Sequence, residues 1–177
     1  MLVGLDISNI NQKNGIGRVN RQIYKYLSVN KKIKKKFYSF KKLNFLNLFI
    51  FKIFKQLWYN FIFPINLYTD NVNQFICHHR IPFLLLSNFL RKKLNITLIL
   101  YDFTFIKYPH TMNIYTRLLD RLLVKSSIKL SNNIIVNSIP VKSELKKNYN
   151  LQNKKVITLG LAPFEKKNSF PKAKKKK

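Results

Sequence analysis

Short apolar runs alternate along the chain with longer segments of helical periodicity, the pattern typical of an α/β protein built on a parallel sheet. The runs LVGLDI, ITLIL, NIIVN and KVITL are apolar at consecutive positions, as expected for strands that are covered on both faces. Six strands are predicted: Leu2–Ile7, Phe37–Phe40, Gln74–His78, Ile96–Leu100, Asn133–Asn137 and Lys155–Leu159. The sequence therefore predicts a parallel sheet of about six strands flanked by helices.

Three amphipathic or capped helices are predicted between these strands. Arg18–Asn30 and Met112–Leu130 each carry apolar residues at the three- and four-residue spacing of one helix face. The stripes are Val19, Ile23 and Leu27 in the first helix and Tyr115, Leu118, Leu119, Leu122 and Leu123 in the second. Ser138 is placed to cap a third helix, which runs to about Tyr149 and accepts Pro140 in its first turn.

Residues 43–63, LNFLNLFIFKIFKQLWYNFIF, are long and apolar enough to raise the question of a membrane span. One stripe steps by three and four residues: Leu43, Leu46, Ile50, Ile53, Leu57 and Phe61. We interpret the segment as a domain helix that packs this stripe on the sheet. In the alternative, its other face rests on an anionic bilayer; that face holds Phe45, Phe49, Lys52, Lys55, Trp58 and Tyr59. A full span is disfavoured because each lysine near the bilayer centre costs roughly 2.5–3.5 kcal/mol.

The net charge of +28, from 34 Lys and Arg against six Asp and Glu, points to an anionic partner. Only six of the basic residues are Arg, however, and the abundant Lys, Asn, Ile, Phe and Tyr are encoded by codons rich in A and T. Base composition therefore explains much of the lysine excess. Because Arg is the preferred residue for bidentate recognition of bases and phosphates, no specific nucleic-acid binding is expected. The 46% hydrophobic share excludes a mostly disordered chain.

Cysteine and histidine usage gives little support to a metal site. The single cysteine, Cys77, excludes an internal disulfide framework and a Cys-rich metal site. His78 and His79 are adjacent and would point to opposite sides of a strand, so no metal site is expected.

The N-terminal residues MLVGLDIS enter an apolar run with neither a positive leader nor a small-residue cleavage site, so we expect a cytoplasmic protein.

A glycine-containing loop is the first candidate site. Gly15, Ile16 and Gly17 stand between the first strand and its following helix, where a free helix N-terminus can bind a phosphate. Asn20 occupies the third glycine position of a dinucleotide fingerprint, and no Gly-Lys-Ser/Thr follows, so neither nucleotide motif is complete. The alternative is a tight turn without a ligand.

Two further strand ends carry polar residues. The buried strand ITLIL delivers Tyr101 and Asp102 to its carboxyl end, where open α/β sheets bind ligands. Ser138 follows another strand in the same way. The structural alternative for both Asp102 and Ser138 is to cap the turn or helix that comes next.

Taken together, these segments resemble a known family. The segments GIGRVNRQIYKYL, LYDFTFIKYP and NNIIVNSIPVKSELKKNYNLQNKKVITLGLAP are similar to the N-terminal domain of family 4 glycosyltransferases, which are retaining enzymes of two-domain GT-B architecture. The mannosyl- and hexosyltransferases of surface-polysaccharide synthesis are the nearest in kind. The resemblance spans about Leu2 to Pro163. It implies a Rossmann-like domain over 1–162, one half of a GT-B fold, followed by a disordered basic tail over 163–177.

The resemblance also implies site residues. Gly15, Ile16 and Gly17, with Arg18 following, match the family's loop near the sugar-nucleotide phosphates. Tyr101 and Asp102 match a position that is often His-Asp in the family, and are therefore the candidate catalytic residues. The serine that opens the late helix in the family matches Ser138. The family's proline-acid pair is Pro109-His110 in this chain, which is a departure from the pattern.

The family's second domain binds the donor with a basic pair and two glutamates eight positions apart, whereas the only glutamates here, Glu144 and Glu165, lie 21 positions apart. We therefore expect a truncated or split half-enzyme that is inactive alone, with a separately encoded donor domain as its partner. Its nucleotide-sugar is a substrate, so no cofactor or metal is expected. A glycan or lipid-linked acceptor implies a peripheral position at the inner face of the plasma membrane.

Two other interpretations remain open at this stage. One is a non-catalytic basic module that binds anionic membrane or nucleic acid, and the other is a non-functional remnant.

Overall fold

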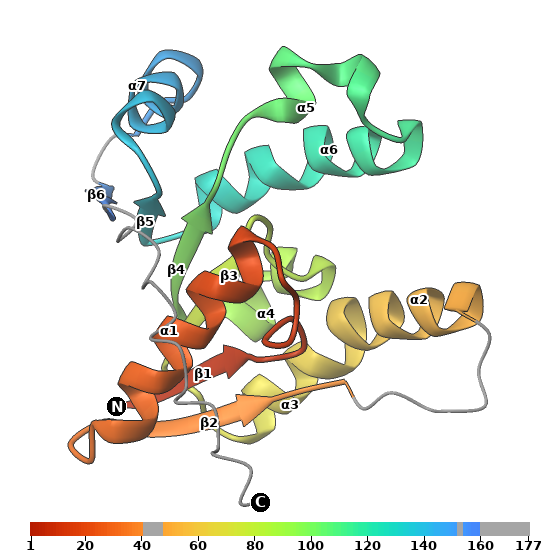
Figure 1. The fold of residues 1–177 in the computed structure, drawn as a ribbon. Coiled ribbons are helices and arrows are strands. Elements are labelled where there is room, and N and C mark those ends of the chain that lie inside the picture. Colours follow the sequence, from red (N-terminus) through yellow and green to blue (C-terminus); the bar gives the residue numbers. More distant parts are fainter. Residues whose placement is uncertain (41–47, 152–153, 160–177) are drawn as a thin grey trace, which may run out of the picture.

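The computed structural model describes residues 1–40, 48–151 and 154–159, apart from the side chains of Leu48, Phe49 and Tyr115. Six strands form one sheet in the order β2-β1-β3-β4-β5-β6, and every neighbouring pair is parallel (Figure 1). The strands are β1 Leu2–Asp6, β2 Lys34–Tyr38, β3 Gln74–His78, β4 Asn95–Leu100, β5 Asn133–Val136 and β6 Lys155–Thr158. The predicted α/β fold with a six-stranded parallel sheet is confirmed.

One strand begins earlier than expected. β2 starts at Lys34, three residues before the predicted start at Phe37, and it ends at Tyr38 rather than at Phe40. It is an edge strand that pairs only with β1, and Lys34 and Lys36 are exposed on it. An edge strand accepts charged side chains that a central strand would have to desolvate, which is why the lysine run can continue into the sheet.

Helices connect the strands on both faces of the sheet (Figure 1). The longer ones are α1 Gly15–Val29, α2 Leu48–Leu57, α3 Phe63–Thr69, α6 Ile114–Leu130 and α7 Ile139–Asn148, with a π-helical turn Trp58–Ile62 between α2 and α3. The short ones are the 3-10 turns Phe83–Leu86 and Pro109–Thr111 and the single-turn helices α4 Asn88–Arg91 and α5 Thr104–Lys107. The helices predicted over Arg18–Asn30, Met112–Leu130 and Ser138–Tyr149 are therefore present, with ends shifted by up to three residues.

Most of the buried apolar residues that the structure describes belong to one of two clusters. On one face, Val3 and Leu5 of β1 pack with Leu27 of α1. On the other, a larger cluster joins the sheet to α3, α6 and α7 through residues such as Phe63 and Val124. From β1 the chain first adds β2 on one side, and it then adds β3 to β6 on the other side. Because crossovers between parallel strands are right-handed, α1 and the later helices lie on opposite faces of the sheet.

The orientation predicted for the 43–63 helix is wrong. In the part that the structure describes, the stripe expected on the sheet is exposed: Ile50 42%, Ile53 44%, Leu57 48% and Phe61 43%. Trp58 and Tyr59, expected outside, pack against the main cluster instead, and Trp58 stacks on Phe63 with ring centroids 5.2 Å apart. Periodicity marks a helix's apolar face but not the neighbour that this face meets. Leu43, Leu46 and Phe45 lie outside the described residues, as does the Phe49 side chain.

The stripe predicted for α6 is also partly wrong. Leu118 and Leu122 are 57% and 61% exposed, and Leu119 and Leu123 are only partly buried. The face of α6 that meets the core instead carries Asp120, Val124, Ser127 and Ile128. Two of these residues are polar, so the buried face lacked the apolar signal that the prediction relied on. Among the described residues, no helix combines the length and the apolar character needed to cross a bilayer.

Candidate functional site

A cleft of about 390 Å³ opens at the carboxyl ends of β1 and β3. Its walls come from β1, the β1–α1 loop, α2, the π-helical turn, the end of β3 and α6. The polar lining residues are Asp6, Asn9, Gln12, Lys52, Lys55, Gln56, Tyr59, His78, His79, Arg80, Thr116 and Asp120, and Trp58 and Cys77 complete the wall. β1 and β3 are adjacent although β2 lies between them in the chain. The order in which the chain adds strands therefore reverses here, from β2 on one side of β1 to β3 on the other. Open α/β sheets bind ligands at such a topological switch point.

Asp6 is the last residue of β1 and forms the floor of the cleft. It is 7% exposed, and its carboxylate accepts a hydrogen bond of 2.8 Å from the Ser8 amide. Its carbonyl oxygen accepts a second bond of 2.9 Å from Nδ2 of Asn20, a fully buried residue of α1. Burial raises the pKa of the Asp6 carboxyl, against the opposing effects of the Ser8 hydrogen bonds and the Lys55 charge. One carboxylate oxygen is thus bonded to Ser8, and the carboxyl group can also accept a hydrogen bond from a ligand hydroxyl.

His78, at the end of β3, forms a pair with Tyr101, which follows β4. The His78 Nδ1 and the Tyr101 Oη are 2.8 Å apart, and the two rings are nearly parallel at 17°. Burial lowers the pKa of His78 to about 4 and raises the pKa of Tyr101, so both groups are neutral at pH 7. The His78 Nε2 is buried and has no hydrogen-bond partner among the described residues.

That unpartnered nitrogen is the most informative atom of the site, because buried polar groups in folded proteins are almost always hydrogen-bonded. In the tautomer in which Tyr101 donates to Nδ1, Nε2 carries the proton and is a donor. His78 lines the cleft, so a ligand oxygen there could complete its hydrogen bonding.

The segment after β3 is fixed by a buried carboxylate. Asp120 of α6 lies 3.2 Å from the Arg80 Nη1 and 3.3 Å from the His79 Nε2, and its side chain is 5% exposed. The Tyr59 hydroxyl donates a 2.8 Å hydrogen bond to the Arg80 carbonyl. His79 itself has a φ of 65°, in the left-handed region. The chain thus turns out of the sheet after β3, and the His79 and Arg80 side chains are held in the cleft wall.

Two lysines enter the cleft from α2. The Lys55 Nζ donates a 2.9 Å hydrogen bond to Oδ1 of Asn9 in the β1–α1 loop, and its charge acts on Asp6. Lys52 also lines the cleft and is exposed.

Cys77 is in the wall, but burial raises the pKa of its thiol, so it stays protonated and does not serve as a nucleophile. The described residues include no cluster of three His, Cys, Asp or Glu that could hold a metal ion.

The predicted glycine loop lies beside the cleft rather than in its wall. Asn14 caps α1, accepting a 2.9 Å hydrogen bond from the Gly17 amide. A Cβ at Gly17 would lie 2.1 Å from the Gln12 carbonyl oxygen, so glycine is required there for close packing of the loop. Gly15 meets nothing within 4 Å. Gly15, Ile16, Gly17 and Arg18 do not line the cleft, whereas Asn9 and Gln12 of the same loop do.

The other predicted residues lie at the same edge of the sheet. Asp102 is exposed, and its carboxylate accepts a 3.0 Å hydrogen bond from the Thr104 amide. Ser138 caps α7 through a 3.4 Å bond from the Val141 amide. Both therefore have the structural roles that were the alternatives to ligand binding, and neither lines the cleft. Their roles in binding or catalysis remain predictions, as does that of Tyr101, which reaches the site through His78.

Sequence reasoning missed most of the cleft wall. Asp6 could have been found from its position at the end of a buried strand, and His78 from the same signal one strand further along the sheet. Lys55 and Asp120 gave no such signal, because each sits within a helix whose buried face was misassigned.

Comparison of the chain with protein-family profiles, with curated proteins and with solved structures found no significant match.

Proposed function

We propose that this chain is the acceptor-binding half of a glycosyltransferase, which transfers a hexose from a nucleotide-sugar to a glycan or lipid-linked acceptor in surface-polysaccharide synthesis. The observation that carries the proposal is the polar cleft at the carboxyl ends of β1 and β3, the place where open α/β sheets bind ligands. The sequence resemblance supplies the class of reaction, and the cleft supplies a site for the acceptor.

The cleft chemistry suits a polyhydroxylated ligand. The Asp6 carboxyl can accept a hydrogen bond from a sugar hydroxyl, and the unpartnered His78 Nε2 can donate one to a sugar oxygen. The Gln56 amide adds a donor and an acceptor, and the Trp58 ring adds an apolar surface. In this scheme Asp6 orients the attacking hydroxyl, and Tyr101 is a positioning residue that sets the His78 ring.

The same cleft offers little to the donor. Transfer from a nucleotide-sugar requires the charge on the leaving diphosphate to be neutralised. In the cleft, Arg80 is paired with Asp120 and Lys55 is hydrogen-bonded to Asn9, so of the lysine and arginine side chains in its wall only Lys52 is exposed. Glu144 of α7 is paired with Lys107 of α5, and Glu165 lies outside the described residues. We therefore propose that a donor-binding half completes the enzyme, that the chain alone does not transfer sugar, and that neither a metal nor a cofactor takes part. A lipid-linked acceptor would bring the chain to the inner face of the plasma membrane.

The test is a calorimetric titration of the 177-residue chain with a water-soluble acceptor analogue, a short-chain prenyl diphosphate hexose. We expect saturable binding that His78→Asn weakens by about tenfold, because the shorter amide lacks a donor at the Nε2 position and one buried hydrogen bond to the ligand is lost. The control is His110→Asn, made at an exposed residue outside the cleft, which should bind as the wild type does. The absence of binding, or equal binding by both variants, would contradict the proposal.

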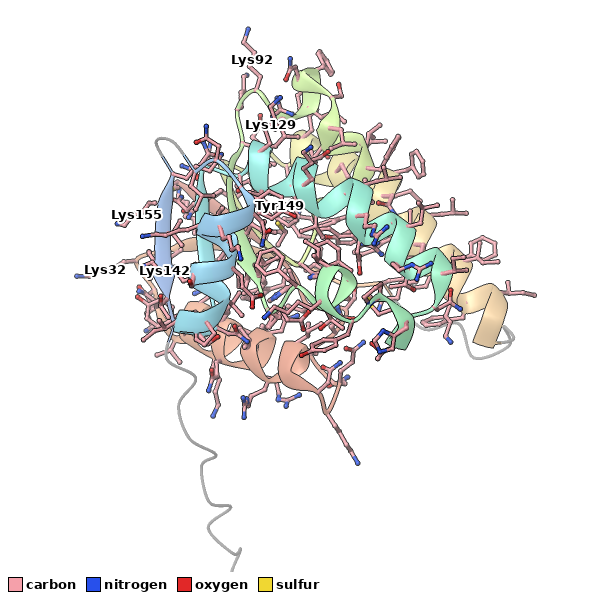
Figure 2. The ribbon with its side chains drawn as sticks, turned by 90° about the horizontal axis from the view of Figure 1, so that it is seen from above. Lys32, Lys92, Lys129, Lys142, Tyr149 and Lys155 are labelled. Carbon is pink, nitrogen blue, oxygen red and sulfur yellow. The ribbon has the colours of Figure 1, made fainter. Side chains whose placement is uncertain are left out.

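The alternative of a basic module that binds nucleic acid has less support, because the described cleft has few lysines and arginines in its wall: Lys52, Lys55 and Arg80, of which Arg80 is paired with Asp120. In Figure 2, Lys92 points outward at the top of the view, whereas Lys32 and Lys155 point outward on the left. The alternative of a membrane-binding module is favoured by one specific observation, the apolar face described next.

A further inference from the structure

The continuous helical segment 48–69 exposes an apolar face along its whole length. We call this face, with two neighbouring phenylalanines, the apolar ridge. Its members are Ile50, Ile53, Phe54, Leu57, Phe61, Ile62, Ile65, Tyr68, Phe83 and Phe89, each more than 40% exposed. The surface is continuous, because Phe61 contacts Phe83 and Tyr68 contacts Phe89 with ring centroids 6.2 and 5.5 Å apart. In Figure 2 the side chains of α2 project away from the rest of the molecule on this side.

The orientation of α2 is the reverse of that usual for a helix on the surface of a globular protein. Surface helices normally turn their apolar stripe inward and their charges outward. Here Lys55 points into the cleft and bonds Asn9, while Ile53, Phe54 and Leu57 face outward. Monomeric proteins seldom expose a continuous apolar surface of this extent, and such surfaces mark sites of protein or membrane interaction.

The excess of basic over acidic residues around the ridge indicates an anionic partner. Between residues 48 and 94 the chain has six basic residues, Lys52, Lys55, Arg80, Arg91, Lys92 and Lys93, and a single acidic one, Asp70. Asp70 already pairs with Lys36 of β2. Lys92 and Lys93 are exposed and follow directly on α4, which carries Phe89 of the ridge. Arg80 is paired with Asp120 on the cleft side, but Lys92 and Lys93, beside the ridge, form no ion pair with a described residue. The ridge therefore combines exposed apolar side chains with two unneutralised cations.

We propose that the apolar ridge docks on the surface of an anionic lipid bilayer, with its apolar side chains in the interfacial layer and Lys92 and Lys93 among the acidic headgroups. Aromatic and aliphatic residues flanked by lysines are the composition of interfacial helices, and an anionic surface attracts a chain of net charge +28. The same charge opposes self-association through this face, because two copies would repel each other.

Docking in this orientation would bring the cleft close to the membrane. α2 presents its apolar side to the bilayer and its lysines to the cleft, so the cleft lies about one helix diameter, roughly 10 Å, from the lipid surface. The phosphates that link an acceptor sugar to its lipid would then meet Lys52 and Lys55 first. This last step rests on the proposed function, whereas the docking itself is argued from the ridge and its charges alone.

The test is co-sedimentation of the full chain with vesicles of phosphatidylcholine, alone or mixed with phosphatidylglycerol, in the absence of any sugar substrate. The ridge variant is Phe54→Ser with Phe89→Ser, at side chains 49% and 71% exposed. The matched control is Val29→Ser with Ile139→Ser, at apolar side chains 81% and 76% exposed on α1 and α7. All four residues are exposed, so the variants should remain folded, which far-ultraviolet circular dichroism checks.

We expect binding that requires the acidic lipid, that the ridge variant weakens by about tenfold or more, and that the control variant retains. Equal binding by the two variants would overturn the proposal, since lysines alone would then account for it. No binding by the wild type would also overturn it, as would a dimer in solution that the ridge variant dissociates. These outcomes are separate from the acceptor titration, which uses no vesicles, so either proposal can fail without the other.

Discussion

Replacing His78 should change how the stability of the protein depends on pH. Burial of the ring lowers the pKa of His78 from its ordinary value of 6.5 to about 4. The unfolded chain therefore binds a proton at this residue between pH 6.5 and pH 4, while the folded chain does not. Stability falls as the pH falls through this window and is complete above it. The difference between the two pKa values corresponds to a loss on the order of 3 kcal/mol by pH 4.

The assay is urea unfolding at a series of pH values between 7 and 4, for the wild type and for His78→Gln, which does not titrate. Asp6 acts in the opposite sense, because its raised pKa favours the folded state as the pH falls. The difference between the two proteins therefore isolates His78. We expect the wild type to lose more stability than the variant below pH 6.5, by on the order of 3 kcal/mol at pH 4. Parallel curves would refute the reasoning, since they would mean that the imidazole takes up its proton in the folded chain.

Three further outcomes follow from the same structure. Gly17→Ala should destabilise the fold by about 2 kcal/mol, because its Cβ would lie 2.1 Å from the Gln12 carbonyl oxygen; Gly15→Ala, in open space, should be neutral or stabilising by thermal unfolding. Asp120→Ala should cost about 3 kcal/mol in urea unfolding, because it leaves Arg80 without its buried partner; a loss near zero would show that water replaces the carboxylate. Nucleic-acid binding in filter or gel assays should be independent of sequence and fall steeply between about 50 and 200 mM salt; a sequence-selective complex in physiological salt would count against the glycosyltransferase proposal.

The sheet could be predicted from sequence because its strands carry their own signal. Gln74–His78 was predicted to the residue, and the strands corresponding to β4, β5 and β6 were placed to within one residue. Apolar runs buried on both faces depend little on which element covers them. β2 was the exception, since it is an edge strand whose lysine residues resemble a solvated segment.

The helix faces and the cleft depend on tertiary contacts that no local pattern encodes. The 43–63 stripe was recognised as apolar, but the core takes Trp58 and Tyr59, whose polar atoms need partners such as the Arg80 carbonyl. Asp120 meets Arg80 across 40 residues of sequence. His78 was considered only as half of a metal pair with His79, and its hydrogen bond to Tyr101 could not be inferred without the pairing of β3 with β4.

The most direct test of the central claim, that the cleft at the ends of β1 and β3 binds the acceptor, is to map the bound analogue on the chain. Amide chemical shifts of the 177-residue protein would be followed by nuclear magnetic resonance as the short-chain prenyl diphosphate hexose is added. The account predicts that the largest shifts fall at Asp6, Lys55 and His78, with a smaller change at Tyr101. Shifts confined to exposed lysines such as Lys32 and Lys155, or no shifts at saturating analogue, would contradict it.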